Sequence, residues 1–337
     1  MKKKIMAVVD TESAYAYNFM EYLNQKRNIP FEIQAFTNVE NLAKFTREQP
    51  VEILLISDQA MNDGVKQLPI RQIIILSEGI MPLNLEEYPS VYKYQSSETV
   101  VREVLAYYGE RQAKEVVPCM LRNKTRVIGV YSPVGRSMKT SFALSAGQLL
   151  AKYKPVLYLN LEEYAGFEDM FQKTYEKNLS DLLYYQRQKE GNLACQMVGM
   201  IHSINGLDYL PPVLSPTDLI HTSYEEWEEL IHVIQNQSEY EVLIIDVGDG
   251  IDDLYNFLDL CDVIYMPLLS DSISKAKVKQ FENLLRMWDC IPVLEKIKKI
   301  QLERPKMVLP QEHYMEQLVW SEFGRNVKKI LEQDKEL

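Results

Sequence analysis

A lysine–threonine pair at the start of a helical stretch is the most informative chemical feature of the sequence. Lys139 and Thr140 follow a short loop that contains Gly135, and the loop follows the apolar run Arg126–Tyr131. In a strand–loop–helix unit of this kind, backbone N–H groups and the helix N-terminus face phosphates, the lysine reaches the terminal phosphates, and the threonine holds Mg²⁺. We therefore expect a site for ATP or ADP with Mg²⁺. Its candidate residues are Gly135, Arg136, Ser137, Met138, Lys139, Thr140 and Ser141.

Two acidic residues further along the chain could complete this site. The apolar run Val242–Asp246 ends in a carboxylate, and Gly248 follows, an arrangement that places an acid beside a Mg²⁺-bound water. A second run, Val156–Leu161, is followed by Glu162. We expect Thr140 and Asp246 to hold the Mg²⁺. Glu162 and Asp246 are the catalytic candidates, although the sequence assigns neither a definite role.

A separate set of polar residues lies in the first third of the chain. Asp10, Asp58, Ser77 and Lys93 each come at or near the end of an apolar run. The carboxyl ends of parallel strands meet at one edge of a sheet, so these side chains should share a pocket. Such a pocket suits phosphoryl transfer to Asp58, with Asp10 helping to hold Mg²⁺, Lys93 neutralising the aspartyl phosphate and Ser77 bonding the phosphoryl group.

Apolar runs alternate with helical patterns in the first 108 residues, which predicts a flavodoxin-like parallel sheet with helices on both faces. The expected strands are Ile5–Val9, Phe31–Phe36, Ile53–Ile56, Ile73–Leu76 and Val91–Tyr94. Helices are expected around Tyr15–Gln25, Val39–Arg47 and Glu98–Tyr108. A charged stretch then breaks the pattern, and we interpret residues 109–124 as a linker.

A second α/β series is predicted for residues 125–337, with unbroken β-rich runs typical of strands buried on both faces. The expected strands are Arg126–Tyr131, Val156–Leu161, Leu207–Leu210, Val242–Asp246 and Val263–Pro267. Long helices are expected after Thr140, Pro216 and Ser274. The predicted fold class is therefore α/β, with two doubly wound parallel-sheet domains.

Composition limits the classes of function. The 337 residues are 46% hydrophobic and 25% charged, an ordinary globular balance, and the net charge is −11. An acidic surface disfavours binding to nucleic acid, because contact with the phosphate backbone needs clustered Lys and Arg. Four separated cysteines and four separated histidines show no metal-ligand spacing. No apolar stretch approaches the roughly 20 residues of a membrane span, so we expect a cytoplasmic protein.

The first domain resembles the response-regulator receiver family on short motifs. Its first strand ends in Val8-Val9-Asp10, its acceptor segment is Ile56-Ser57-Asp58-Gln-Ala-Met61, and Ser77 and Lys93 match the switch hydroxyl and lysine. The second of the family's paired acids is replaced by Thr11. A weakened acidic pair should weaken Mg²⁺ binding. The alternative is a receiver fold kept as a docking module, with Asp58 a solvated carboxylate.

The second domain resembles the MinD/ParA branch of P-loop ATPases, whose loop reads K-G-G-x-G-K-[ST]. Gly135, Lys139 and Thr140 match this loop, and Asp246 with Gly248 matches the Walker B strand. The departures are Val134 for the signature lysine, Arg136 and Met138 for two glycines, and Asn160 and Glu162 for the switch aspartates. The resemblance implies nucleotide binding without fast hydrolysis. A P-loop fold that no longer binds nucleotide remains the alternative.

The two domains in this order are similar to the TadZ/CpaE architecture. Gly206-Leu-Asp-Tyr-Leu-Pro-Pro212 and Trp320-Ser-Glu-Phe-Gly-Arg-Asn-Val327 also resemble segments of those proteins. The resemblance implies a localisation factor of the tight-adherence (Flp, type IV) pilus secretion machinery. It implies a homodimer that pairs through the P-loop faces. It also implies a place at the inner face of the cell membrane or at the pole, where Lys328-Lys329 could attract anionic lipid weakly.

Two other functions remain open from the sequence. One is an active ATPase switch of the partitioning type, against which the missing signature lysine argues. The other is a response regulator in which phosphorylation of Asp58 controls a P-loop output domain, against which the incomplete acidic pair argues.

Overall fold

The computed structural model describes residues 4–25, 31–79, 85, 87–111, 125–189, 192–303 and 313–334. The chain divides into two compact units, and each is described by itself. The first unit comprises Met1–Met120 together with Glu190–Gly199. The second comprises Leu121–Lys189 and Met200–Leu337. Within the described residues, no helix is both long and apolar enough to cross a membrane.

The first unit is built on a five-stranded parallel sheet in the order β2-β1-β3-β4-β5. Its strands are β1 (Lys4–Val9), β2 (Phe31–Phe36), β3 (Val51–Ser57), β4 (Ile70–Ser77) and β5 (Ser90–Tyr92). Its helices are α1 (Ser13–Gln25), α2 (Val39–Phe45), α3 (Asp63–Lys66), α4 (Ser97–Arg111) and α8 (Leu193–Val198).

The sheet of the first unit is covered on both faces because its central strands are apolar throughout. In β1, Met6 and Val8 share one apolar cluster with residues of α1 and α4, whereas Ala7 and Val9 share another with residues of α2 and α3. This alternation follows from the two-residue period of a strand. All of these side chains are almost fully buried.

The short helix α8 belongs to the first unit although it is distant in sequence. Cys195 lies in the same apolar cluster as Leu105 and Tyr108 of α4. The backbone N–H of Asn192 donates to the carbonyl of Gly109 at 3.1 Å. The chain therefore returns to the first unit after it has built the first helices of the second.

The second unit contains a seven-stranded sheet in the order β12-β11-β6-β10-β7-β9-β8, in which only the β8–β9 pair is antiparallel among the described strands. Its strands are β6 (Arg126–Val130), β7 (Val156–Leu161), β8 (His202–Ile204), β9 (Leu207–Tyr209), β10 (Val242–Val247), β11 (Val263–Leu268) and β12 (Ile297–Gln301). Its helices are α5 (Lys139–Ala151), α6 (Phe167–Phe171), α7 (Leu179–Gln188), α9 (Pro216–Ile220), α10 (Tyr224–Gln237), α11 (Leu254–Asp259), α12 (Ser272–Met287), α13 (Ile291–Lys296), α14 (Tyr314–Trp320) and α15 (Glu322–Gln333).

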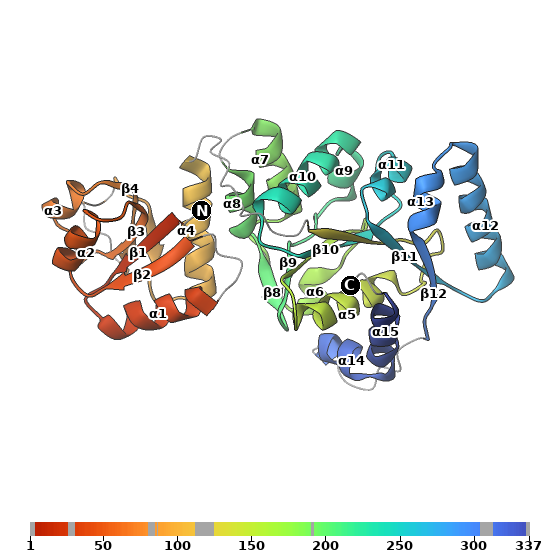
Figure 1. Cartoon of the computed structure of the whole chain (residues 1–337), viewed down its shortest axis with the longest axis horizontal. Helices are drawn as coiled ribbons and strands as arrows, with labels where there is room; N and C mark the ends of the chain where they lie inside the picture. Colours follow the sequence, from red (N-terminus) through yellow and green to blue (C-terminus); the bar gives the residue numbers. More distant parts are fainter. Residues whose placement is uncertain are drawn as a thin grey trace. The chain divides into compact units, whose positions relative to one another are not determined.

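Helices cover both faces of this second sheet. Helices α5, α14 and α15 lie on one side, and α7, α9, α10 and α11 lie on the other (Figure 1). Phe142 of α5, Leu318 of α14 and Val327 of α15 join one apolar core with the strands. The predicted fold class, two doubly wound parallel-sheet domains, is confirmed.

The structure adds features to the predicted elements. The edge strands β8 and β12 were not expected, and α4 continues through Arg111 into the segment interpreted as a linker. Residues 112–124 of that segment lie outside the described residues. The strand predicted at Val91–Tyr94 is shorter, at Ser90–Tyr92. Edge strands are hard to predict because only part of their surface is buried, as the largely half-buried or exposed residues of β8 and β12 show.

Candidate functional site

The loop between β6 and α5 contains two residues with left-handed backbone. Arg136 has φ 60° and Met138 has φ 69°. For a residue other than glycine, this conformation costs roughly 1–2 kcal/mol. Gly135 lies outside the left-handed region, and a Cβ added to it would meet no atom within 4 Å. The loop thus has left-handed backbone, which favours glycine, at two positions that carry large side chains.

Lys139, the first residue of α5, is engaged by groups of its own chain. Its Nζ lies 2.7 Å from Glu162 Oε1 and donates to the carbonyl of Val247 at 2.9 Å. It also lies 5.6 Å from the centre of the Tyr131 ring. The Lys139 side chain is only 10% exposed. Glu162 therefore compensates the charge of this lysine within the domain.

Asp246 is fully buried at the end of β10, beside the start of α5. Its Oδ2 accepts from the Tyr158 hydroxyl at 3.1 Å and from Asn160 Nδ2 at 3.2 Å. Its Oδ1 is buried and makes no hydrogen bond of ordinary geometry within the described residues. Strand register explains the grouping, because Asp246 pairs with Asn160 of β7 and Tyr158 lies two residues earlier on the same face.

The surroundings of Asp246 favour its protonated form. Burial raises the pKa of Asp246 from 3.8 to about 7, and the charge of Glu162 adds to the rise. The Thr140 hydroxyl, the charge of Lys139 and the Tyr158 hydroxyl act in the opposite direction. A carboxyl group with this pKa is half-charged near neutral pH, so a bound cation would strongly favour its ionised form.

These groups fit a nucleotide with Mg²⁺. A cation needs oxygen ligands, and the Thr140 hydroxyl and Asp246 Oδ1 are available beside each other. Ser137 Oγ is likewise buried without a partner among the described residues. Within the same residues, no three His, Cys, Asp or Glu side chains gather to hold a metal alone. A Mg²⁺ at this site would take its remaining ligands from phosphate and water.

Two residues near the loop are enclosed by the domain itself. Val134 is 4% exposed. Ser141 shares a hydrogen bond of 2.9 Å with the Tyr314 hydroxyl of α14. The Ser141 hydroxyl is therefore engaged with Tyr314, and only the backbone N–H of Ser141 could take the phosphate-binding role predicted for this residue.

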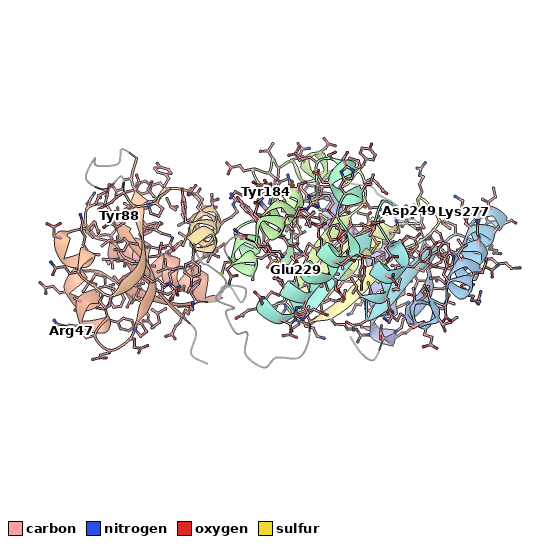
Figure 2. The ribbon with its side chains drawn as sticks, turned by 90° about the horizontal axis from the view of Figure 1, so that it is seen from above. Arg47, Tyr88, Tyr184, Glu229, Asp249 and Lys277 are labelled. Carbon is pink, nitrogen blue, oxygen red and sulfur yellow. The ribbon has the colours of Figure 1, made fainter. Side chains whose placement is uncertain are left out.

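Gly248 allows the ends of β10 and β7 to meet. Its N–H donates to the carbonyl of Leu161 at 3.1 Å, and a Cβ at this position would collide with that carbonyl. Asp249, labelled in Figure 2, follows and accepts from the Tyr131 hydroxyl at 3.1 Å. The close approach brings Glu162 to Lys139.

The pocket of the first unit is organised around Lys93, which is fully buried. Its Nζ lies 3.0 Å from Asp10 Oδ2, 3.1 Å from Glu12 Oε1 and 3.2 Å from Glu78 Oε1. The Tyr15 ring centre is 4.9 Å away. Burial lowers the pKa of Lys93, but hydrogen bonds to these three carboxylates outweigh it and raise the pKa above its usual value.

The other predicted pocket residues lie at the same edge but are not joined to this cluster by ion pairs among the described residues. Asp58 follows β3, and its backbone N–H donates to the carbonyl of Leu76 at 3.4 Å. The Ser77 hydroxyl accepts from the N–H of Gly79 at 3.1 Å. Lys93 thus forms its ion pairs with Asp10, Glu12 and Glu78 and not with Asp58.

Sequence reasoning missed several residues that shape the two sites. In the second unit these are Tyr158 and Tyr131, and in the first they are Tyr15 and Glu78. Tyr158 could have been found, because the two-residue strand period places it on the face of Asn160. Glu78 directly follows Ser77, but the direction of its side chain is set by a loop. A loop has no periodic sequence pattern from which that direction could be predicted.

Residues 1–109 match the family model of the TadZ-like receiver domain. The first domain is therefore similar to this family over its whole length. A TadZ-like receiver followed by a domain with a P-loop type of strand–loop–helix unit fits a TadZ/CpaE-like protein. The comparison with curated protein sequences gave no match.

Several solved structures share weak similarity with part of the chain. A ParA family ATPase from Chlorobium tepidum TLS is 17% identical, with a TM-score of 0.49 over 61% of this chain and 98% of that one. A plasmid partition protein from Borrelia burgdorferi is 15% identical, with a TM-score of 0.45 over 63% and 98%. Cobyrinic acid a,c-diamide synthase from Mycobacterium smegmatis with bound ATP analogue and magnesium is 16% identical, with a TM-score of 0.41 over 63% and 81%.

The left-handed backbone at position 136 yields a stability prediction. Arg136→Gly should give a more stable protein than Arg136→Ala, by about 1 kcal/mol, because only glycine relieves the positive φ. Both variants remove the same exposed charge, so their difference isolates the backbone. Urea unfolding followed by circular dichroism measures it. Equal stability of the two variants would contradict a left-handed residue at this position.

Asp246 yields a prediction about pH. Its pKa is raised on folding, so its contribution to stability is complete below its ordinary pKa and is lost as the pH rises towards about 7. Asp246→Asn stays neutral at every pH. Without Mg²⁺ or nucleotide, its melting temperature should exceed that of the parent by at least about 2 °C near pH 8, and by less near pH 5. A difference that grows on acidification would show that folding lowers the pKa of Asp246 instead of raising it.

Lys93 yields a prediction for the first unit. Lys93→Met leaves the buried Asp10 carboxylate without its partner, a change that typically costs about 3–5 kcal/mol. Hydrogen exchange should accelerate throughout β1 and β3. Glu78→Gln is the matched control. The Glu78 side chain is 29% exposed, and removing its charge leaves no buried charge without a partner. Similar exchange in the two variants would show that the buried pair contributes little.

Proposed function

We propose that the second domain binds ATP or ADP with Mg²⁺, and that the chain is a nucleotide-binding localisation factor of a tight-adherence (Flp, type IV) pilus secretion system. The TadZ-like receiver match supports the pilus assignment. The geometry at the start of α5 supports the nucleotide.

The observation that carries the nucleotide proposal is the conformation of the loop. Arg136 and Met138 keep a left-handed backbone despite its cost, and the loop leads directly into the N-terminus of a 13-residue helix. Strain of this kind persists where the surroundings impose it and is common at functional sites. The N-terminus of α5 presents unpaired N–H groups and a positive dipole end to an anion.

Weak or absent hydrolysis is the second part of the proposal. The signature lysine position is a buried valine, Val134, so no ammonium group from this position can reach a partner's phosphates. Lys139 already has a carboxylate partner in Glu162 at 2.7 Å. Nucleotide must therefore displace an ion pair before it gains the lysine, which lowers affinity and leaves less charge to stabilise a transition state.

For the first domain we propose a docking module rather than a phosphorylated switch. The Lys93 ammonium is buried with Asp10 and contacts two further carboxylates. A phosphoryl group on Asp58 would have to compete with all three for this lysine. The response-regulator alternative is disfavoured for that reason.

The oligomeric state of the protein and its place in the cell are also part of this proposal. We propose a homodimer that pairs through the P-loop faces, in contact with pilus secretion proteins and at the periphery of the cell membrane or pole. Because Val134 removes the cross-subunit lysine, the dimer should depend little on the γ-phosphate. Sedimentation with ATP, with ADP and without nucleotide tests this, and a monomer in all three conditions would refute it.

Calorimetric titration with Mg²⁺ and ATP tests the central proposal. The parent should bind, and Lys139→Ala should bind at least about tenfold more weakly. Lys173→Ala, at an exposed lysine of the same domain, is the control and should bind like the parent. Glu162→Gln should bind more tightly, because it removes the competing charge. ATP turnover should stay below the roughly 1 s⁻¹ of working enzymes.

Two outcomes would contradict the proposal. If neither the parent nor Glu162→Gln binds ATP, the domain is a P-loop fold that does not bind nucleotide. Tighter binding by the parent than by Glu162→Gln would mean that Glu162 supports the Mg²⁺ instead of competing with phosphate.

A further inference from the structure

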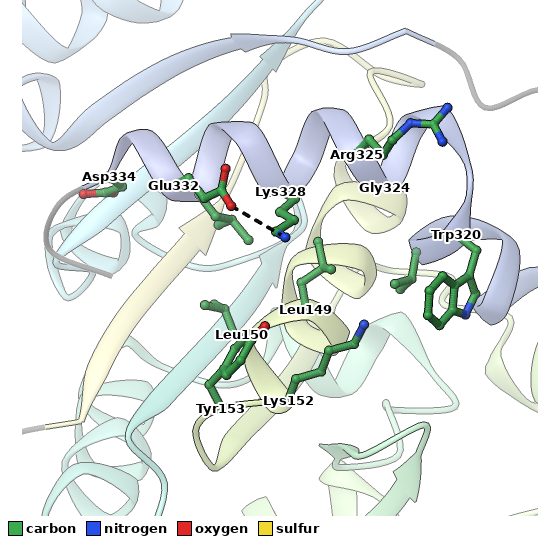
Figure 3. A pocket seen from close by; sticks show the side chains of 12 residues that line it. Leu149, Leu150, Lys152, Tyr153, Trp320, Gly324, Arg325, Lys328, Glu332 and Asp334 are labelled. Carbon is green, nitrogen blue, oxygen red and sulfur yellow. Dashed lines mark ion pairs between the residues drawn. The ribbon is translucent and has the colours of Figure 1, made fainter.

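A recess of about 650 Å³ lies between the end of α5 and the α14–α15 corner of the second domain (Figure 3). Leu149 and Leu150 of α5 and Leu331 of α15 line its apolar surface. Tyr153 and Trp320 flank it and are 76% and 75% exposed. Large aromatic side chains left open beside an apolar recess of this size are typical of binding sites.

The edge of the recess carries positive charge on a chain whose net charge is −11. The Lys152 ammonium lies 4.8 Å from the centre of the Trp320 ring, and Arg325 makes no ion pair within the described residues. Lys328 pairs with Glu332 at 3.7 Å, but both side chains are more than half exposed, so this pair is weak. A carboxylate beside Trp320 would find the Lys152 ammonium available, whereas Arg325 projects outward from α15 and adds a second positive charge at the edge (Figure 3).

The one other acid at the recess does not cancel this charge. Asp334 accepts from the Tyr265 hydroxyl at 2.7 Å and pairs with Lys298 at 2.6 Å. It is 7% exposed. Its charge is therefore compensated within the domain, and the accessible edge stays basic.

The helices that form the recess are held together by buried contacts. Ser145 and Gln148 of α5 donate to the carbonyls of Leu318 and Met315 in α14. Gly324 lets α15 start close to α14, because a Cβ there would collide with the carbonyls of Leu318 and Val319. The recess is pre-formed, so a ligand could bind without the free-energy cost of rearranging the helices.

We propose that this recess binds an acidic segment of a partner protein, anchored by one large apolar side chain. The apolar lining is concave and lies between two helices, which suits an inserted side chain better than the flat surface of a bilayer. Lys152 then bonds a carboxylate of the segment, Arg325 adds positive charge at the edge, and Trp320 and Tyr153 enclose the apolar anchor. Exposed Trp and Tyr side chains beside a pocket are typical of the strongest contacts at protein interfaces.

Selection from random peptides of about 12 residues, displayed on phage and presented to the full-length protein, tests this proposal. Enriched sequences should combine Trp, Phe or Leu with Asp or Glu a few positions away. The most enriched peptide, synthesised with a fluorescent label, should lose at least about tenfold in affinity with Arg325→Glu, Lys152→Glu or Trp320→Ala. Lys173→Glu reverses an exposed charge elsewhere and should leave the affinity unchanged. All four substitutions are at exposed positions, and thermal melting checks that each variant folds.

Other results would overturn the proposal. These are no enrichment, enrichment of basic peptides, or peptide binding that ignores the three recess substitutions. If those substitutions instead abolish binding to phosphatidylserine vesicles, or change the sedimentation of the protein alone, the occupant is a membrane or a second copy of the chain.

Discussion

The second domain depends on the parallel register of β10 between β6 and β7. Asp246 lies opposite Val130, where the chain leaves β6 for the loop, and opposite Asn160 of β7. Gly248 then approaches the carbonyl of Leu161 too closely for any side chain. From these two contacts follow the meeting of Lys139 with Glu162 and Val247, and the burial of Asp246 behind Thr140. A shift of one residue in this register would turn Asp246 to the opposite face of the sheet.

The two domains share one electrostatic arrangement. In each, the lysine that the sequence predicts for a phosphoryl group is held by one or more carboxylates of its own chain. Lys93 is held by Asp10, Glu12 and Glu78, and Lys139 by Glu162. Such internal pairs stabilise the unliganded protein and reduce the gain from any incoming anion. The receiver pocket has the stronger version, because Lys93 and Asp10 are fully buried.

The sequence was sufficient for the core strands and for the strand-end positions of Asp10 and Asp246, since each depends on local pattern. Apolar runs predict β6, β7 and β10, and strand ends place Asp10 and Asp246. The left-handed backbone at Arg136 and Met138 could not be predicted, because their own propensities oppose it and the closure of the loop imposes it. The return of Cys195 to the first unit also escaped prediction, since its contacts with α4 join distant parts of the chain. The polar strand β12 shows no apolar run at all.

In the function that we propose, the altered loop still forms a phosphate site, and nucleotide must take Lys139 from Glu162. A crystal structure with Mg²⁺ and a non-hydrolysable ATP analogue tests this most directly. We expect phosphates at the N-terminus of α5, Lys139 Nζ within hydrogen-bond distance of them and separated from Glu162, and left-handed backbone retained at Arg136 and Met138. An intact Lys139–Glu162 pair, with no nucleotide at saturating analogue, would contradict it.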